Sequence, residues 1–350
     1  MANNRVTGQD VADRAGVSRT TVSLVLNNVP GTQISEATRK RVQLAAKELN
    51  YVPDAAAQAL ASRQSQIIGL ILIRTPHQVA SDYFLTVTLD GLIQSVHSRG
   101  MRLLIDIVEP KHQAETYLQM VRAKRIDGII ISGPRLDDDA LNALKEARFP
   151  TVLLGQIPGN WFSTVDVDNR AAARTAVAHL LKLGHRRIAC ITNAPLTYTA
   201  AVDRLHGYRD ELQAASIPYD SELVRYGEFD CESGYQQMNN LLDSGTKFTA
   251  VFVASDILAV GAEAAIREHG LHVPEDIALV GFDNLPFSPF IDPPLTSIHL
   301  PAVDLAQQAA DMLFTILAGI EPDPKQIILE TQLVVRESCG SKYSRRINSD

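Results

Sequence analysis

The stretch TGQDVADRAGVSRTTVSLVLNN, residues 7–28, has the pattern of two short helices joined by a tight turn. Thr7 and Asp10 have the spacing of a capping box, which predicts the start of a first helix. Gly16 should end that helix, and Ser18 should cap the second one. Each helix has an apolar stripe, with Val11, Ala12 and Ala15 on the first and Val22, Val25 and Leu26 on the second.

The second helix keeps polar side chains for another surface, namely Arg19, Thr20, Thr21, Ser23 and Asn27. Guanidinium, hydroxyl and amide groups bond base edges and phosphates, and a recognition helix places its N-terminal residues in the major groove. The pattern therefore predicts a helix-turn-helix that binds DNA. A small helical hairpin with a polar outer face is the alternative interpretation.

The segment resembles the lactose/galactose repressor (LacI/GalR) family. The family pattern D-V-A, A-G-V-S, T-V-S and L-N-N is matched at Asp10–Ala12, Ala15–Ser18, Thr21–Ser23 and Leu26–Asn28. Further matching motifs follow in order: ELNYVPDAAAQALASRQSQIIGLI from Glu48, VDVDN ending at Asn169, HLLKLGHRRIACI from His179, RLHGY from Arg204, ASD at Ala254, VGFDN from Val280 and PPLTSI from Pro293. The resemblance thus covers nearly the whole chain.

The resemblance implies a set of DNA-contacting residues. In the headpiece they are Thr7, Ser18, Arg19, Thr20, Thr21, Ser23, Leu24, Asn27 and Asn28, and in the hinge they are Ala57 and Leu60. Leu60 holds the position of the family's leucine wedge, which enters the minor groove and kinks the operator. Many relatives have Arg or His where this chain has Leu24, so the base pair facing Leu24 cannot be inferred from them.

The expected fold is a small all-α helix-turn-helix headpiece followed by an α/β body of two doubly wound parallel-sheet subdomains, like periplasmic binding proteins. The expected domains are residues 1–52 (headpiece), 53–66 (hinge helix or linker), 67–340 (effector-binding and dimerisation body) and 341–350 (loose tail). In the body, near-continuous apolar runs such as IIGLILI, RLLIDI and AVFVAS predict strands buried on both faces. The resemblance implies that the chain passes between the subdomains more than once, and Pro and Gly clusters near 155–164 and 287–294 are the expected crossings.

A ligand of such a body is expected at the carboxyl ends of the strands, in a cleft between the subdomains. The candidate effector-binding residues are Tyr83, Phe84, Gln156, Arg204, Phe229, Ser255 and Asp283. Of these, Arg204 and Asp283 match the family's effector-contacting positions, and Phe229 holds a position used for stacking on a ring. Asp256 is expected to cap the following helix instead. Gly155 replaces an Asp that many relatives have, so the effector cannot be copied from a relative.

Composition limits the class of protein. The whole chain carries a net charge of −7, but residues 1–66 hold eight basic and five acidic residues, so a headpiece of +3 precedes a remainder of −10. No apolar run approaches the roughly 20 residues that span a bilayer, and the start lacks a signal-peptide core, so the cytoplasm is expected. The three cysteines are not clustered, which predicts neither a disulfide framework nor a metal site.

No catalytic motif is present, and His185 is expected to bond backbone rather than act in catalysis. The sequence therefore predicts a sequence-specific transcriptional regulator, a homodimeric repressor without a cofactor. Its expected partners are a pseudo-palindromic operator in double-stranded DNA, where it would be nucleoid-associated, and a small-molecule effector, a sugar first and a nucleoside or purine next. The resemblance implies dimer contacts from Leu85–Ser98. A solute-binding receptor and an architectural DNA-bending protein remain as alternatives.

Overall fold

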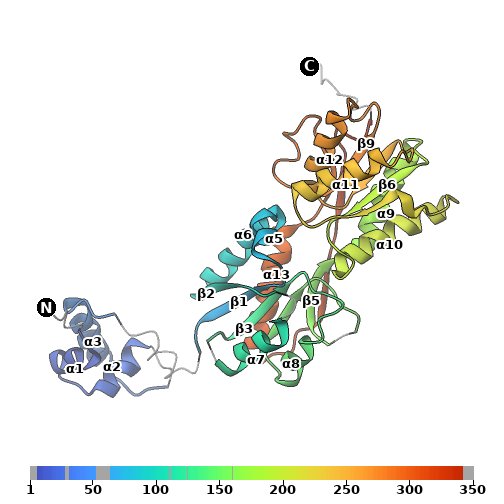
Figure 1. Cartoon of the computed structure of the whole chain (residues 1–350). Coiled ribbons are helices and arrows are strands. Elements are labelled where there is room, and N and C mark those ends of the chain that lie inside the picture. The colour runs from blue at the N-terminus through green and yellow to red at the C-terminus, as the bar shows by residue number, and fades with distance from the viewer. Residues whose placement is uncertain are drawn as a thin grey trace, which may run out of the picture. The chain divides into compact units, whose positions relative to one another are not determined.

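The computed structural model of the chain describes residues 6–27, 31–52, 64–109, 112–123, 125–159 and 161–341. It divides into two compact units, Met1–Gln66 and Ile67–Asp350, whose elements are labelled in Figure 1. The predicted contacts of Asn28, Ala57 and Leu60 with DNA, and the tail from residue 342, lie outside the described residues. No helix in the described part of the chain is long and apolar enough to cross a membrane.

The first unit contains α1 (Gly8–Ala15), α2 (Arg19–Leu26) and α3 (Glu36–Glu48). Thr7 and Asp10 form the predicted capping box, Ser18 accepts a hydrogen bond from Thr21 N–H, and Gly16 ends α1 with φ of 64°. The helices enclose one small core made of Val11, Ala12, Ala15, Val22, Val25, Val42, Ala45 and Ala46. These contacts hold the polar face of α2 outward on a folded three-helix unit.

The second unit begins with a six-stranded parallel sheet in the order β11-β5-β4-β3-β1-β2. Its strands are β1 (Ile67–Leu72), β2 (Arg102–Ile107), β3 (Gly128–Ser132), β4 (Thr151–Leu154), β5 (Ser163–Val167) and β11 (Gln326–Leu329). Its helices are α5 (Pro76–Ser81), α6 (Tyr83–Ser98), α7 (Gln113–Ala123), α8 (Leu141–Glu146) and α13 (Ala302–Leu317). The α6–α13 pair covers one face, and α7 and α8 cover the other.

The second sheet has the order β12-β10-β9-β8-β6-β7, parallel except for β12, which pairs antiparallel with β10. Its strands are β6 (Ile188–Thr192), β7 (Val224–Tyr226), β8 (Ala250–Val253), β9 (Ala278–Asp283), β10 (Thr296–His299) and β12 (Gln332–Val334). Its helices are α9 (Asn169–Lys182), α10 (Thr199–Ala214), α11 (Cys231–Asp243) and α12 (Asp256–Glu268), with a short 3₁₀ turn η2 (Ser221–Leu223). The α9–α10 and α11–α12 pairs cover opposite faces. The two parallel-sheet subdomains agree with the predicted fold class.

The predicted crossing sites were wrong by several residues. The chain leaves the first sheet between β5 and α9, at Asp168, and returns between β10 and α13, at residues 300–301. It crosses again between β11 and β12, at residues 330–331. The Pro and Gly clusters near 155–164 and 287–294 instead form loops that lead into β5 and β10, each within one sheet.

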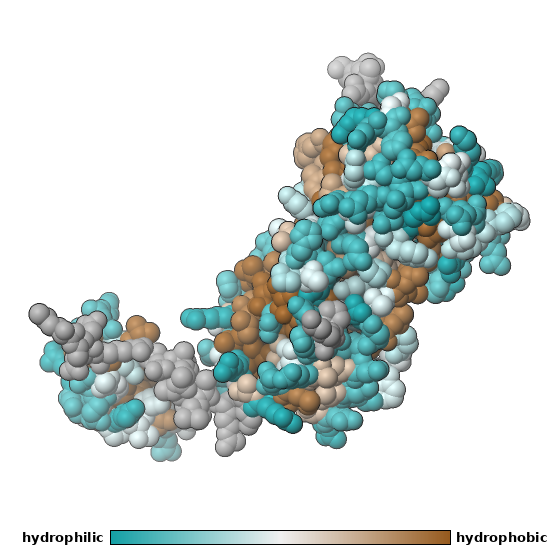
Figure 2. Space-filling view, in the orientation of Figure 1, coloured by the Kyte–Doolittle hydropathy of each residue, from teal (hydrophilic) through white to brown (hydrophobic). Residues whose placement is uncertain are grey.

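The expectation that the apolar strands are buried on both faces fails for β2. This strand is at the edge of its sheet, and its Leu104, Ile105 and Ile107 are 47%, 44% and 37% exposed. Ile93 on the neighbouring α6 is also exposed. Figure 2 shows hydrophobic residues gathered on this flank of the body. An edge strand has a neighbour on one side only, so a run of isoleucines and leucines does not by itself ensure burial.

Candidate functional site

The polar face of α2 is the candidate DNA interface. Arg19, Thr20 and Ser23 are exposed, whereas Thr21 and Leu24 are partly buried. Arg19 and Thr20 lie in the first turn of α2, where recognition helices make base contacts. The observed surface therefore combines a guanidinium group with hydroxyl groups, as the sequence predicts.

Some predicted DNA-contacting side chains also hold the headpiece together. Thr7 Oγ1 hydrogen bonds with an Asp10 carboxylate oxygen at 2.8 Å. Ser18 Oγ lies 2.9 Å from Thr21 Oγ1, and Asn27 Nδ2 donates to Ser23 Oγ at 3.1 Å. These bonds preorganise the surface, and they also mean that substitutions there affect helix caps as well as DNA contact.

The cleft between the two sheets is the candidate effector site. It contains about 770 Å³ of space between protein atoms, part of which is open to solvent. It lies beyond the carboxyl ends of the strands, where open α/β sheets bind ligands. Five of the seven residues predicted for the effector site line it, namely Phe84, Arg204, Phe229, Ser255 and Asp283.

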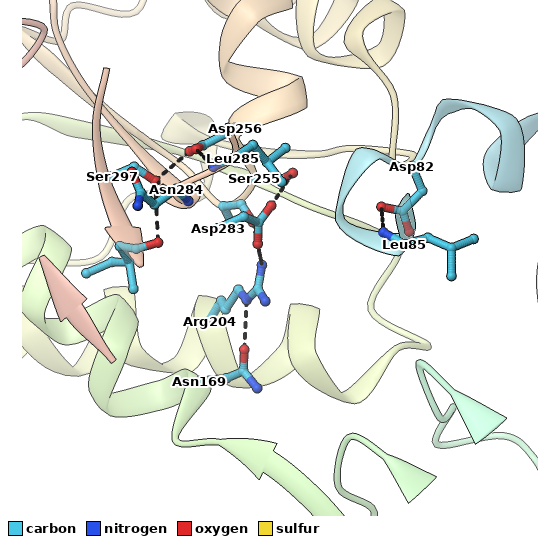
Figure 3. Close-up of polar contacts among 12 residues, drawn as sticks. Asp82, Leu85, Asn169, Arg204, Ser255, Asp256, Asp283, Asn284, Leu285 and Ser297 are labelled. Carbon is cyan, nitrogen blue, oxygen red and sulfur yellow. Dashed lines mark hydrogen bonds and ion pairs between the residues drawn. The ribbon is translucent and has the colours of Figure 1, made fainter. Parts of the chain in front are cut away.

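Arg204 contacts several neighbouring elements at the cleft (Figure 3). It lies in the second turn of α10 rather than at the start of the helix, and it is 6% exposed. Its Nε donates to Asn169 Oδ1 at 2.9 Å, and its Nη1 donates to the Ala254 carbonyl oxygen at 2.7 Å. Asp283 Oδ1 lies 3.7 Å from Nη1, and the Phe282 ring centroid lies 3.8 Å from the guanidinium carbon. Arg204 therefore joins α9, α10, β8 and β9 beside the cavity.

Ser255 and Asp283 form a hydrogen-bonded pair beside the Arg204 guanidinium. Ser255 Oγ donates to Asp283 Oδ2 at 2.8 Å, and both residues are buried. Asp283 ends β9 with φ of 107°, a conformation that a non-glycine residue rarely adopts and that is common at functional sites. The Asp283 carboxyl group is thus held at the carboxyl end of β9.

Asp256 does not cap α12 as predicted. Its carboxylate accepts hydrogen bonds from Leu285 N–H at 2.9 Å, from the Ser288 hydroxyl at 2.5 Å and from the Ser297 hydroxyl at 2.6 Å. It therefore fixes the loop after β9 and the start of β10, which is still a structural role. The local sequence suggests a cap because Asp is favoured at helix starts. In the fold, however, hydroxyl and amide donors from distant residues occupy the Asp256 carboxylate instead.

The predicted aromatic residues have different environments. Phe84 lines the cleft, but Tyr83 is 52% exposed, packs edge-to-face on Phe287 and does not line the cavity. Phe229 lines the cleft with φ of 69°, and Tyr198 meets its ring edge-to-face at 4.9 Å. Adjacent residues at a helix start point in different directions, so only one of the two, Phe84, faces the cavity.

Gln156 is also placed outside the cavity lining. Its side-chain amide nitrogen, Nε2, donates to the Val167 carbonyl oxygen at 3.4 Å, and Gln156 is not among the residues that line the cavity. Gly155 does line the cleft, and a side chain there would collide with Pro134, whose Cδ is 2.4 Å from the position of a Cβ. The wall of the cleft at Gly155 is therefore formed by backbone atoms.

Several polar lining residues were not predicted, namely Arg74, Asp82, Ser132, Asp166, Asn169, Asn193, Tyr198 and Thr199. Asp166 and Asn169 lie in the quoted VDVDN motif, so that motif could have indicated them. Asp82 caps α6 by accepting a hydrogen bond from Leu85 N–H at 3.1 Å, which is a recognisable pattern. Arg74 and Tyr198 have no local signal, because only the tertiary fold brings them to the cavity.

Burial controls the titration of the carboxyl groups in the cleft. It raises the pKa of Asp166 to about 6, although hydrogen bonds from Val167 N–H and the Arg204 charge oppose the shift. It also raises the pKa of Asp283, against the attraction of Arg204, and the nearby Asp256 charge adds to the rise. Burial in the cleft thus favours the protonated form of both carboxyl groups.

The two subdomains contact each other around the cavity. Tyr198 Oη donates to the Ile73 carbonyl oxygen at 2.7 Å, and Leu136 N–H donates to the Thr197 carbonyl oxygen at 2.8 Å. Near the start of α5, Gln78 Nε2 donates to Glu228 Oε2 at 2.9 Å. The cleft is therefore bridged by direct contacts between its two walls.

Other singled-out side chains lie away from this cavity. His185 Nδ1 lies 2.9 Å from the Thr249 hydroxyl, a side-chain partner instead of the expected backbone one. Trp161 is exposed, with Lys145 Nζ 3.1 Å from its ring centroid. Cys190, Cys231 and Cys339 are free thiols. The described residues contain no group of three or more His, Cys, Asp or Glu placed to hold a metal ion.

Comparisons with known proteins agree with this architecture. Residues 7–54 match the family described as "Bacterial regulatory proteins, lacI family", and residues 177–339 match the "Periplasmic binding protein-like domain". The HTH-type transcriptional regulator CelR of Thermobifida fusca is 36% identical over 337 residues, covering 95% of this chain and 98% of CelR.

Two solved structures are similar over almost the full length. A transcriptional regulator CelR-cellobiose complex has a TM-score of 0.73 and 35% identity, covering 95% of this chain and 100% of that one. The lac repressor dimer bound to operator and the anti-inducer ONPF has a TM-score of 0.82 and 32% identity, covering 96% and 99%. From the capped helices of the headpiece, the twin-sheet body and these full-length similarities, it follows that the chain belongs to the lacI family of bacterial regulatory proteins.

Proposed function

We propose that this regulator is a cytoplasmic homodimeric repressor that binds a pseudo-palindromic operator through paired α2 helices and responds to a sugar or sugar derivative in the cleft. The observation that carries the proposal is the bridged cavity. It holds guanidinium, carboxyl, amide and hydroxyl groups next to aromatic rings, within a chain that also carries the α2 surface. The CelR-cellobiose complex supports a sugar as the effector class.

Coupling between cleft and DNA would act through the arrangement of the two subdomains. A ligand that contacts both walls favours one arrangement over another, and it can change operator affinity only by its difference in affinity for the two. Operator and effector must then change each other's affinity by the same factor. The proposed hinge contact of Leu60 with the minor groove belongs to this coupling.

The second copy would cover the apolar flank formed by α6 and β2. The exposed Ile93, Leu104, Ile105 and Ile107 form a surface that includes the helix Leu85–Ser98 expected to mediate dimerisation. Exposed apolar surface of this kind is typical of a protein interface. A two-fold dimer matches two operator half-sites.

The test begins with selection of random DNA duplexes by the purified full-length protein at fixed salt. Recovery of one pseudo-palindromic site is expected, and the site then serves as the probe for a screen of sugars and nucleosides. Sequence-independent binding alone would favour an architectural DNA-bending protein instead.

A hinge variant refines the same assay. Leu60→Ala should reduce affinity for the selected site much more than affinity for unrelated DNA, because a wedge contributes only where the duplex kinks. Equal losses on both DNAs would remove the wedge role.

A further inference from the structure

Arg74 is a buried cation of the cleft that the sequence did not single out. It follows β1 by two residues, lines the cavity and is 5% exposed. Its guanidinium carbon lies 4.2 Å from the ring centroid of Phe229, which belongs to the other subdomain. Arg74 therefore covers a face of the Phe229 ring, which was expected to stack on a ligand. The Arg74 guanidinium lies beside that ring in the cleft.

The protein provides hydrogen-bond partners for only part of the Arg74 guanidinium group. Arg74 Nη1 donates to Asp82 Oδ2 in a buried ion pair, and the other Asp82 oxygen is occupied by Leu85 N–H. Arg74 Nε–H is buried and has no hydrogen-bond partner among the described residues. An unpaired buried donor costs roughly 1–3 kcal/mol, and more when it is charged. A ligand oxygen at this edge would remove that cost.

Arg204 provides the contrast within the same cavity. Its Nε and Nη1 are both bonded to protein oxygen atoms, those of Asn169 and Ala254. Arg74 Nε has no such partner among the described residues, and Nε belongs to the side-on edge with which a guanidinium grips a carboxylate through two parallel hydrogen bonds. Arg204 is thus held more fully by the protein, and Arg74 keeps an unused donor for a ligand.

Asp82, the ion-pair partner of Arg74, also meets the positive end of a helix. The single Asp82 charge is shared between Arg74 and the N-terminus of the 16-residue α6, whose dipole is positive at that end. Another lining residue specifies the remainder of the ligand. Asn193 Oδ1 is buried without a partner in the described part of the chain, so it requires a donor such as a hydroxyl group.

We propose that Arg74 makes the cleft selective for polyhydroxylated acids, meaning sugars that carry a carboxylate. The carboxylate binds the Nε edge of Arg74, and a hydroxyl group of the same ligand donates to Asn193 Oδ1. This inference rests on the proposed function, because the ligand is the effector of the cleft, and it narrows the effector to one chemical class.

The test is isothermal titration calorimetry of the full-length protein at constant ionic strength. D-glucuronate, D-galacturonate and D-gluconate are compared with D-glucose and D-galactose. At least one acid is expected to bind tenfold or more tightly than its neutral counterpart and to change the affinity for the selected operator.

The variant must remove the arginine without leaving Asp82 buried and unpaired. The double variant Arg74→Gln, Asp82→Asn removes both charges, and Asn can still cap α6. It should lose the preference for the acid while it still binds operator. The matched control Arg135→Gln, Asp137→Asn removes an ion pair with 2.7 and 2.8 Å hydrogen bonds whose residues do not line the cleft, and it should keep the preference.

Three results would overturn the inference. Neutral sugars that bind as tightly as the acids would refute the role of Arg74 while leaving a sugar-controlled repressor intact. An unchanged acid preference in the double variant would assign the carboxylate to another group. Absence of binding by every acid would also refute it, and if no neutral sugar altered operator binding either, the proposed sugar effector would fail with it.

Discussion

Arg204 combines a ligand-facing position with a structural one, and this changes what its removal should do. Arg204→Ala removes two hydrogen bonds and leaves Asp283 buried without its nearest cation. We expect effector affinity to fall at least tenfold, since one charge-assisted hydrogen bond contributes about 1.5–3 kcal/mol. We also expect the thermal unfolding midpoint to fall, because an uncompensated buried charge costs on the order of 3 kcal/mol. Calorimetry and thermal unfolding measure the two effects.

The control is Arg209→Ala on the same helix. Arg209 stacks on Tyr219 outside the effector cleft, so its loss should leave effector affinity unchanged. Operator binding by ligand-free protein should stay near normal in both variants. A normal effector response in Arg204→Ala would show that Arg204 does not contact the ligand.

Asp166 should give the body a characteristic dependence of stability on pH. An unfolded Asp titrates near ~3.9, whereas burial raises the pKa of Asp166 to about 6 in the folded protein. Between these values the folded state binds more protons than the unfolded state, so the stability contributed by this group falls as pH rises and levels off above the folded pKa. The free energy of unfolding of wild type relative to Asp166→Asn should therefore fall by about 2 kcal/mol from acidic to neutral pH, less than the full linkage value because Asp166 is only partly buried.

Urea unfolding of both proteins across this pH range measures that difference. Asn at position 166 can still accept the hydrogen bond from Val167 N–H, which is 2.8 Å from Asp166 Oδ1. Parallel stability curves for the two proteins would mean that Asp166 titrates normally in the fold.

The residue scale also shows which site residues a sequence can reveal. Asp283 directly follows an apolar strand, and Arg204 lies within a recognisable motif, so both could be assigned to the cleft before the fold was known. Arg74 and Asn193 also follow strands, but nothing nearby shows that Arg74 meets Phe229 across the cleft. Such contacts depend on the distance between two subdomains, which local pattern does not contain.

At the scale of elements, helix starts were predictable and short strands were not. The caps at Thr7 and Ser18 both form as the sequence indicates, because capping is a local interaction. The strands β5 and β10 have the sequences STVDV and TSIH, whose polar residues mask the strand pattern. They are nonetheless buried because tertiary packing covers them, which explains why the crossings that follow them were misplaced.

The α11–α12 pair depends on close backbone contact at Gly261. A Cβ at this position would lie 1.9 Å from the Cys231 carbonyl oxygen and 2.6 Å from Tyr235 N. Gly261→Ala must separate the two helices, since the opposing atoms are backbone and cannot rotate away. We expect a loss of at least about 2 kcal/mol in the free energy of unfolding, the usual range for overpacking. Urea unfolding monitored by circular dichroism checks this value.

Glu263→Ala is the control on the same helix. Glu263 bonds Arg267 one turn away at the surface, so its loss should cost only about 0.5 kcal/mol. Both variants should retain the headpiece fold, because the α1–α3 unit has its own core. If Gly261→Ala were no less stable than Glu263→Ala, the helices would have room to adjust and the contact would not limit packing.

At the scale of the whole molecule, connectivity is the feature that sequence pattern predicted least well. Alternating strands and helices indicate parallel sheets, but they do not assign a helix to one sheet or the other. α13 illustrates this, because it follows β10 of the second sheet and packs on the first. The repeated crossings tie the two subdomains into one unit, so a ligand between them can influence both.

The apolar flank provides a test of assembly. Ile105→Lys places a charge on the exposed edge strand β2, where a second copy would bury it, so we expect the dimer to dissociate at concentrations where wild type remains associated. Sedimentation velocity measures the association, and operator affinity should fall with it because a monomer occupies only one half-site.

The control Ile328→Lys changes an equally exposed isoleucine, at 47%, on β11 at the opposite edge of the same sheet. It should remain dimeric and bind operator normally. If the two variants behaved alike, the flank of α6 and β2 would not be the dimer surface, whereas dissociation of Ile105→Lys alone would connect the exposed strand to the two-fold recognition of DNA.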